Sequence, residues 1–301
     1  MMPRPDDDRM PSMKLSDHVH LGIIGYPIRH ALSPLMHNTA IRELGLDCEY
    51  HSIEIRPENL ARDFRKLVDD GYTGLNVTLP HKQSVIGLLD EVDPTAQAIG
   101  AVNTIRIREG LSVGYNTDAL GFLTSVEPVA DAFASRNVLL LGSGGAARAV
   151  LYGIVTRFHP SEIIVAGRNP SKCEKLVRDF AGLAREKTSW HTIGLDGREI
   201  DRIVREATVI INTTPVGMSP HEAATPLPHT TRFFPHQVAI DVVYNPIETM
   251  FLRTASLGGA RTLDGLGMLI YQGMAAFEIF TGHTMPVAAV RSALEGKLGK
   301  K

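Results

Sequence analysis

The segment Val138-Leu139-Leu140-Leu141-Gly142-Ser143-Gly144-Gly145-Ala146-Ala147 decides the fold of this chain. Its apolar run is typical of a buried strand, and the glycine-rich turn after it leads into a helix start. Glycines in such a turn let the backbone approach a pyrophosphate, whose charge meets the free amide groups and the positive dipole of the helix. An ordinary tight turn between strand and helix is the alternative. The segment predicts a dinucleotide-binding turn formed by Gly142, Ser143, Gly144, Gly145 and Ala146.

The next expected strand ends at residue 166 and is followed by Gly167-Arg168-Asn169. An NAD-dependent enzyme places an acid near this position, where it binds the ribose hydroxyls. Here the position holds Arg168, and Lys172 follows one turn later. Two cations suit a 2′-phosphate, which an acid would repel, so we expect NADP as the cofactor and not NAD. A solvated basic helix start is the alternative.

Strands and helices alternate along both halves of the chain, which at 301 residues is long for a single hydrophobic core. In the first half, strands are expected at residues 20–26, 49–55 and 74–79, helices at 33–45, 57–70 and 80–89, and a hairpin at 104–114. In the second half, strands are expected at 137–141, 162–166, 208–212 and 237–243, and helices at 118–127, 145–158, 170–181, 248–257 and 266–280. This rhythm predicts an α/β protein with two domains, each built on a mainly parallel sheet, the second of the doubly wound Rossmann type.

The composition excludes several classes of protein. A formal net charge of −2 argues against sequence-independent electrostatic binding to nucleic acid. No apolar run approaches the length of a membrane span. Residues 1–18 contain three consecutive aspartates and no apolar core, so we expect a disordered leader and no secretory signal. Cys48 and Cys173 fall in different expected domains, which predicts free thiols and a cytoplasmic location. The histidine spacings give no reason to expect a metal.

Two polar segments in the first half point to carbonyl chemistry. Asn76-Val77-Thr78-Leu79-Pro80-His81-Lys82 follows one expected strand, and Gly114-Tyr115-Asn116-Thr117-Asp118 follows the hairpin. Hydride reduction of a ketone creates an alkoxide that must be protonated as it forms, and an ammonium group held by a carboxylate can do this. A solvated lysine in a first helical turn and an aspartate that merely caps a helix are the alternatives.

In the order of these motifs the chain resembles the shikimate dehydrogenase family, from about residue 21 to the C-terminus. The resemblance starts in Gly25-Tyr26-Pro27-Ile28-Arg29-His30-Ala31-Leu32-Ser33-Pro34, with His37-Asn38 shortly after it. It continues through residues 76–82, 101–104, 116–118 and the glycine turn. It ends in Asn212-Thr213-Thr214-Pro215-Val216-Gly217-Met218 and in Asp264-Gly265-Leu266-Gly267-Met268 with Gln272. Seven motifs in register make coincidence negligible.

The resemblance implies a substrate domain of residues 19–117 plus 265–301 and a Rossmann NADP-binding domain of residues 118–264. It implies that Lys82 is the catalytic lysine and Asp118 its partner. The implied substrate-binding residues are Ser33, Asn76, Thr78, Asn103, Asp118, Tyr244 and Gln272. The implied cofactor-binding residues are the glycine turn, Arg168, Asn169 and Lys172 on the adenosine side, and Val242 and Gly265 near the nicotinamide. A monomer or homodimer with small-molecule ligands is expected.

The implied activity is the reversible NADPH-dependent reduction of 3-dehydroshikimate to shikimate. One departure bears on the substrate, because Ala31 stands where the family pattern has the second of two serines that grip the carboxylate. A quinate or dual quinate/shikimate dehydrogenase is therefore the first alternative. A non-catalytic protein that senses NADP or shikimate is the second, but a sensor has no need of a proton-transfer pair such as Lys82 and Asp118.

Overall fold

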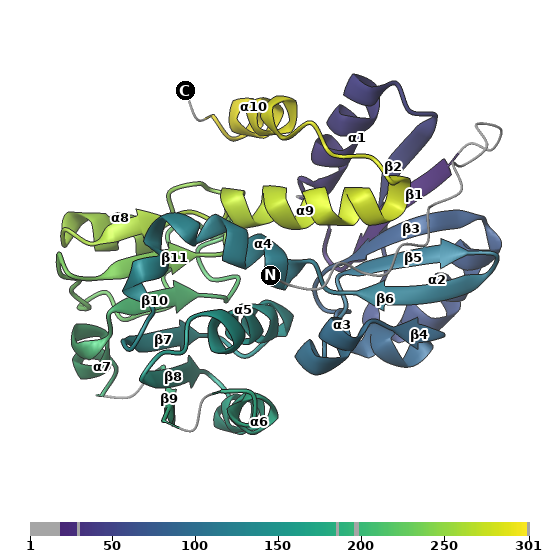
Figure 1. The fold of residues 1–301 in the computed structure, drawn as a ribbon. Helices are drawn as coiled ribbons and strands as arrows, with labels where there is room; N and C mark the ends of the chain where they lie inside the picture. The colour runs from purple at the N-terminus through teal and green to yellow at the C-terminus, as the bar shows by residue number, and fades with distance from the viewer. Residues whose placement is uncertain (1–18, 29–30, 185–186, 196–198, 300–301) are drawn as a thin grey trace.

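The computed structural model describes residues 19–28, 31–184, 187–195 and 199–299, so the expected leader at 1–18 lies outside it. Within these ranges the strands form two six-stranded sheets, each covered by helices. Figure 1 shows the two sheets next to each other, with the long helix α9 (Leu266–Thr281) running across both. The expected α/β architecture with two sheets is confirmed.

The first sheet contains the N-terminal strands in the order β2-β1-β3-β5-β6-β4. Strand β1 pairs in parallel with β2 and β3, and β4 with β6, whereas the predicted hairpin of β5 and β6 is antiparallel. The strands are β1 (Val19–Gly25), β2 (Cys48–Glu54), β3 (Tyr72–Val77), β4 (Glu91–Val92), β5 (Thr104–Arg108) and β6 (Leu111–Tyr115). The helical segments are α1 (Ser33–Leu44), η1 (Pro57–Asn59), α2 (Leu60–Asp69), η2 (Ser84–Leu88) and α3 (Pro94–Ile99).

The second sheet is parallel throughout, in the order β12-β11-β10-β7-β8-β9. This is the strand order of a Rossmann fold, and its central strand carries the apolar run Val138–Leu141, which is fully buried. The strands are β7 (Asn137–Leu141), β8 (Glu162–Gly167), β9 (Ser189–Gly194), β10 (Val209–Asn212), β11 (Val238–Asp241) and β12 (Arg261–Leu263). The helices are α4 (Asp118–Ser125), η3 (Glu127–Ala132), α5 (Gly145–Arg157), α6 (Pro170–Ala181), α7 (Ile200–Glu206) and α8 (Met250–Leu257).

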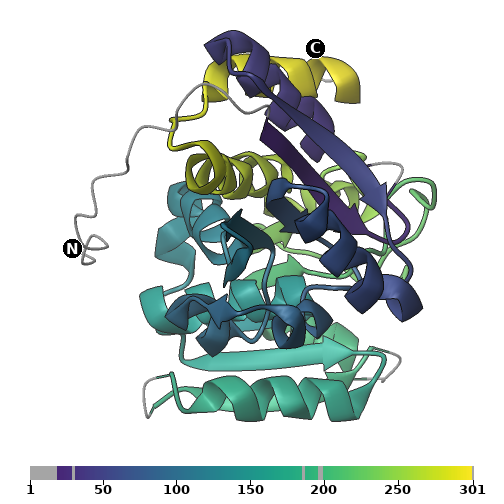
Figure 2. The same ribbon diagram turned by 90° about the vertical axis from the view of Figure 1, so that its right-hand side faces the viewer.

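Helix α9 contributes to the hydrophobic cores of both sheets. Met268 packs in the core that covers one face of the Rossmann sheet, whereas Ile270 and Phe277 pack with β1 and α1. The C-terminal helix α10 (Val287–Leu298) then lies against α1, as Figure 2 shows, where the yellow and purple helices are neighbours. Helices α9 and α10 therefore return to the N-terminal sheet.

The prediction of a helix at residues 80–89 is wrong. The structure has only the short 3₁₀ helix η2 there. In an α-helix the carbonyl of Lys82 would accept a hydrogen bond from residue 86, but it accepts one from Val102 N at 2.7 Å instead. The ring of His81 is buried and lies 2.7 Å from the carbonyl of Ile55. Contacts with neighbouring chain segments therefore outweigh the local helical pattern.

Helix α1 begins at Ser33, and Leu32 is its N-cap residue. Ser33 is the first helical residue and its side chain is buried in the site described below. The elements α3, α7, α10, β4, β9 and β12 had no expected counterpart.

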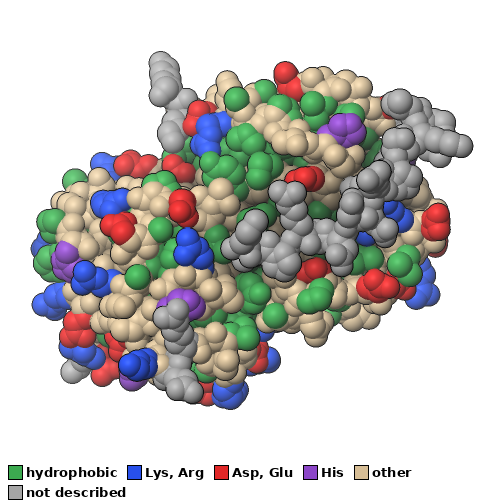
Figure 3. All heavy atoms as spheres, in the orientation of Figure 1, with side chains coloured by type: hydrophobic (Ala, Val, Ile, Leu, Met, Phe, Trp, Pro, Cys, Tyr) green, Lys and Arg blue, Asp and Glu red, His purple; other side chains and the backbone are tan. Residues whose placement is uncertain are grey.

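The surface shows no dominant charge of one sign on the face drawn in Figure 3, where acidic and basic side chains are interspersed. Among the residues that the structure describes, no helix is both long and apolar enough to cross a bilayer.

Candidate active site

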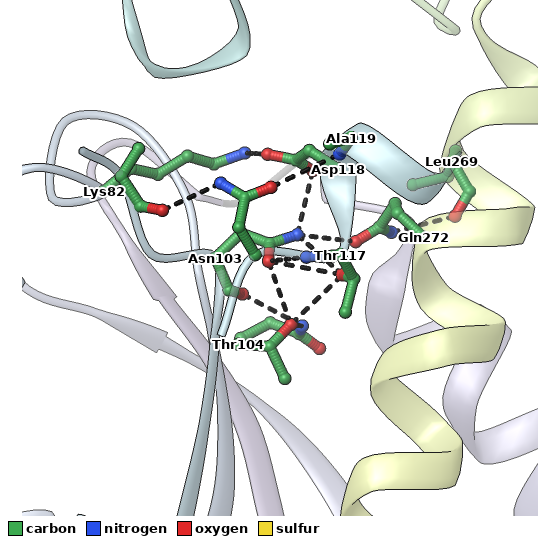
Figure 4. Close-up of polar contacts among 11 residues, drawn as sticks. Lys82, Asn103, Thr104, Thr117, Asp118, Ala119, Leu269 and Gln272 are labelled. Atoms are coloured by element: carbon green, nitrogen blue, oxygen red, sulfur yellow. Dashed lines mark hydrogen bonds and ion pairs between the residues drawn. The ribbon is translucent and has the colours of Figure 1, made fainter. Parts of the chain in front are cut away.

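Lys82 and Asp118 meet between the two sheets, although 36 residues separate them in the chain. The Lys82 Nζ lies 2.5 Å from Asp118 Oδ2, and the two side chains are only 16% and 6% exposed. Lys82 lies in the loop after β3, and Asp118 is the first residue of α4 (Figure 4). An ion pair this short and this buried holds the ammonium in one place, which a solvated lysine would not do.

Asn103 is the centre of the polar network around this pair. Its Nδ2 donates to Asp118 Oδ1 and to Thr117 Oγ1, each at 2.9 Å, and its Oδ1 accepts from Thr117 N at 2.7 Å. Each oxygen of the Asp118 carboxylate therefore has its own donor, Lys82 on one side and Asn103 on the other. The arrangement fixes the orientation of the carboxylate as well as the position of the lysine.

Gln272 reaches the network from α9, 169 residues further along the chain. Its Oε1 accepts from Asn103 Nδ2 at 3.3 Å, and its Nε2 donates to Leu269 O at 2.8 Å (Figure 4). Helix α4 permits this approach through Gly121, because a β-carbon there would lie 2.7 Å from the backbone nitrogen of Gln272. The structure thus brings together four predicted site residues from four separate segments.

A second polar group lies at the end of β3. Asn76 is buried, and its Nδ2 donates to Asn103 O at 3.1 Å and to Thr104 Oγ1 at 3.2 Å. Thr78 follows on the same strand end, with its amide bonded to Ile24 O at 2.9 Å. These contacts place Asn76 beside Asn103, and Thr78 follows two residues later in the chain.

Ser33 and Tyr244 form the third part of the site. The hydroxyl of Ser33 lies near the Tyr50 phenol, and the backbone of Leu32 lies near the Tyr244 phenol. Burial raises the pKa of both tyrosines above its usual range, with these polar neighbours acting in the opposite direction. The two phenols therefore stay protonated at neutral pH.

The glycine turn lies at the carboxyl end of β7 and has the backbone that a pyrophosphate requires. Gly142 has a φ of +112°, which a residue with a side chain rarely adopts. A β-carbon at Gly144 would meet no atom within 4 Å, so a ligand can approach the backbone there and reach the first turn of α5. These features fit a dinucleotide phosphate.

The glycine turn also contacts the candidate catalytic lysine. A β-carbon at Gly145 would lie 3.1 Å from both Cβ and Cδ of Lys82. The predicted cofactor turn and the predicted proton donor are thus in direct packing contact.

Arg168 and Lys172 lie where the sequence placed them, after β8 and in the first turn of α6, and both are exposed. Asn169 is the N-cap of α6, with its side chain accepting from Lys172 N at 3.2 Å. Asn169 therefore has a structural task of its own, whereas the two cations face solvent.

Val242 and Gly265 are also neighbours. A β-carbon at Gly265 would collide with the carbonyl of Val242, and Gly265 N donates to Val243 O at 3.2 Å. Both residues follow the carboxyl ends of strands, as ligand-binding residues of open parallel sheets do.

No group of three or more potential metal ligands occurs among the described residues.

Residues 23–105 match the family model described as the shikimate dehydrogenase substrate binding domain, and residues 265–295 match the shikimate 5′-dehydrogenase C-terminal domain. A shikimate dehydrogenase (NADP(+)) of Methanopyrus kandleri is 42% identical over 91% of this chain and 94% of its own length. The chain belongs to the shikimate dehydrogenase family.

Solved structures of this family and its relatives superpose on almost the whole chain. A shikimate dehydrogenase in complex with NADP⁺ gives a TM-score of 0.83 at 36% identity, covering 95% of this chain and 98% of that chain. Quinate dehydrogenase from Corynebacterium glutamicum in complex with NAD gives a TM-score of 0.81 at 32% identity, covering 92% and 99%.

The sequence did not identify two buried residues of this protein, Tyr50 and Asp241. Asp241, at the end of β11, accepts hydrogen bonds from Asn212 Nδ2, Val243 N and Thr249 Oγ1. Burial raises the pKa of Asp241 to about 7 despite these three donors. The carboxyl group ties together the strand ends that precede Val242. The signal in the sequence that could have identified Asp241 is a single aspartate at the end of an apolar strand.

His37 is a further buried polar residue that the motifs contained without explaining it. Its ring stacks on Tyr50 at 4.3 Å with an interplanar angle of 2°, and among the described residues neither ring nitrogen has a hydrogen-bond partner. Burial lowers the pKa of His37 from 6.5 to about 3. The ring is therefore neutral at physiological pH.

This depressed pKa predicts a specific loss of stability in mild acid. Below about pH 6.5 the unfolded chain protonates this histidine, while the folded protein takes up that proton only near pH 3. The free energy of unfolding should therefore fall as the pH drops, by about 1.4 kcal/mol at pH 5.5 from this group alone. His37→Phe should remove that part of the pH dependence, measured by urea unfolding at pH 8 and pH 5.5.

The comparison must be made between proteins at each pH, because Asp241 has the opposite dependence. Its raised pKa adds stability that is lost as the pH rises towards 7. The exposed histidine His221 provides the control, and His221→Gln should keep the wild-type pH dependence. An identical pH dependence in His37→Phe and wild type would contradict the assignment.

Proposed function

We propose that this protein catalyses the reversible NADPH-dependent reduction of 3-dehydroshikimate to shikimate. Its relatives named shikimate dehydrogenase (NADP(+)) support the reaction and the cofactor. The observation that carries the mechanism is the buried 2.5 Å contact between Lys82 and Asp118 beside the glycine turn.

The cofactor-binding role rests on the turn between β7 and α5. The positive φ of Gly142 and the open space at Gly144 suit a pyrophosphate, and the start of α5 offers free amide groups to its charge. Arg168 and Lys172 would hold the 2′-phosphate. Val242 and Gly265 would line the nicotinamide end, where the bound cofactor supplies the hydride.

The proton-transfer role belongs to Lys82. As the ring ketone becomes an alkoxide, the ammonium of Lys82 donates a proton to the oxygen, and in the reverse direction the amine takes the proton back. Asp118 keeps Nζ in position, and Asn103 keeps Asp118 in position through the other carboxylate oxygen.

The substrate-binding role is divided between the two ends of the site. Ser33 and Tyr244 would bind the carboxylate, and the ring hydroxyls would contact Asn76, Thr78, Asn103, Asp118 and Gln272. This division assigns residues 19–117 and 265–301 to substrate binding and residues 118–264 to NADP binding.

The decisive experiment measures initial rates with shikimate and with quinate, each against NADP and NAD. We expect NADP reduction in the presence of shikimate at alkaline pH, followed by the absorbance of NADPH. A protein that binds NADP and shikimate without producing NADPH would be the sensor alternative.

Dual activity on quinate is the second candidate function, favoured by Ala31. This residue precedes α1, two positions before Ser33, and is half-buried. Its methyl group leaves more room than a serine beside the carbon that carries the carboxylate, where quinate has an additional hydroxyl. It also gives the carboxylate one hydroxyl donor fewer.

Ala31→Ser should tighten shikimate binding by about 1–2 kcal/mol, because the new hydroxyl adds a hydrogen bond to a charged group. It should also depress any quinate activity, measured as the ratio of kcat/KM for quinate to that for shikimate. Ala61→Ser, on the exposed surface of α2, is the matched control. An unchanged ratio in Ala31→Ser would rule out this residue as a determinant of substrate choice.

We propose a reducing compartment, and the cytoplasm in particular, because Cys48 and Cys173 are both buried free thiols. A monomer or homodimer remains our expectation for the quaternary structure.

A further inference from the structure

Tyr50 is held more firmly than its neighbours on the edge strand β2. The side chain of Asn38, from α1, binds both backbone groups of Tyr50, accepting from its N–H at 3.0 Å and donating to its carbonyl at 2.9 Å. The phenol ring lies flat on the ring of His37. Backbone and ring are therefore both fixed, and the side chain is 2% exposed.

The phenol hydroxyl of Tyr50 makes its main contact with a predicted substrate-binding residue. It donates to Asn76 Oδ1 at 2.7 Å. Asn76 Nδ2 faces the backbone carbonyl of Asn103, which can only accept, so the amide of Asn76 has a single orientation in this network. Tyr50 is consequently the donor, and Asn76 Oδ1 retains its second lone pair.

Tyr50 is also connected to the Lys82–Asp118 pair through Asn76. Asn76 continues the chain of contacts to Asn103, whose side chain holds Asp118. A continuous polar path thus runs from Tyr50 through Asn76 and Asn103 to the Lys82–Asp118 pair.

We infer that Tyr50 is a positioning residue of the substrate site, which acts by holding Oδ1 of Asn76 in place. The inference rests on the proposed function. It means that Asn76 presents its oxygen to the substrate as an acceptor, so the ring hydroxyl at that point must donate. Tyr50 takes no part in hydride or proton transfer, and its effect is on substrate binding.

The first test is Tyr50→Phe, which removes the hydroxyl and keeps the ring on His37. Loss of this buried hydrogen bond leaves Oδ1 of Asn76 without its fixed donor, and we expect KM for shikimate to rise about 5- to 30-fold. KM for NADP should stay within about twofold, because the glycine turn makes its contacts elsewhere, and kcat should fall less than KM rises. Tyr72→Phe, on β3 of the same sheet, is the matched control and should leave all three constants unchanged.

A double-mutant cycle with Asn76→Ala separates a positioning role from general loosening of the fold. If Tyr50 acts through Asn76, adding Tyr50→Phe to Asn76→Ala should change KM for shikimate less than about twofold. Independent, multiplicative effects would overturn the inference, and so would an unchanged KM in Tyr50→Phe or an equal rise in KM for NADP.

The wild-type assay distinguishes this inference from the proposed function. A wild-type protein that oxidises neither shikimate nor quinate overturns the proposed function and the role of Tyr50 with it. An active wild type with an unaffected Tyr50→Phe variant overturns the role of Tyr50 alone.

Discussion

Replacing Lys82 by alanine is expected to lower kcat by about 10²- to 10⁴-fold, the usual span for a lost general acid–base group. The side chain removed is the one whose Nζ lies 2.5 Å from Asp118 between the two sheets. Because the alkoxide would then have to take its proton from water, the loss should appear in turnover. The affinity for NADP should change much less, since the glycine turn and Arg168 remain. Steady-state kinetics in both directions measure both quantities.

Lys66 provides a matched control for this experiment. It forms an ion pair with Asp70 at the same distance of 2.5 Å, but on the exposed surface of α2. Lys66→Ala removes an equally short contact and should leave kcat unchanged, because an exposed pair contributes little. Near wild-type turnover in Lys82→Ala would remove this lysine from the mechanism.

Replacing Arg168 by alanine should weaken NADP binding by about 1.5–3 kcal/mol, the range for a hydrogen bond to a charged group. This corresponds to roughly 10- to 150-fold in Kd. The affinity for NAD should be almost unchanged, because NAD lacks the 2′-phosphate that the guanidinium would bind. Titration of both cofactors, followed by the change in protein fluorescence or by calorimetry, gives the two affinities.

Arg178, on the helix α6 that follows Arg168, is the control. It is exposed on α6 and lies 3.8 Å from Glu174. Arg178→Ala should affect neither cofactor. Equal losses of NADP and NAD affinity in Arg168→Ala would mean that the residue shapes the loop and does not distinguish the two cofactors.

The sequence predicted the Rossmann half of the fold in most of its elements, and the reason is physical. A parallel sheet buried on both faces needs continuous apolar strands such as 138–141, and each glycine turn or N-cap marks where a helix begins. Such signals are local, so they can be read without knowing the partners of each strand.

The helix prediction for residues 80–89 was wrong for the opposite reason. Its structure depends on Val102, which binds the carbonyl of Lys82 from a distant part of the chain. No local pattern contains that contact. Tyr50 was missed for the same reason, because its partners Asn38 and Asn76 lie 12 and 26 residues away.

The candidate site was predictable as a set of residues but not as a geometry. Order along the chain pointed to Lys82, Asp118, Asn103 and Gln272, yet nothing in the sequence says that Asn103 holds the free oxygen of the Asp118 carboxylate. Nor does the sequence say that Gly121 admits Gln272 of α9 to this network, which is a matter of packing between two helices.

The contribution of α9 and α10 to the first core affects the synthesis of the protein on the ribosome. The early residues of that core, such as Leu21 and Met36, pack against Ile270, Phe277 and Val290. At a synthesis rate of ~5–20 residues per second, roughly ten to fifty seconds pass between the emergence of the two groups. The Rossmann core draws almost entirely on residues 122–263, so it can assemble during that interval. The N-terminal sheet, although made first, must wait for the end of translation to be covered, and chaperones would meet it in that exposed state.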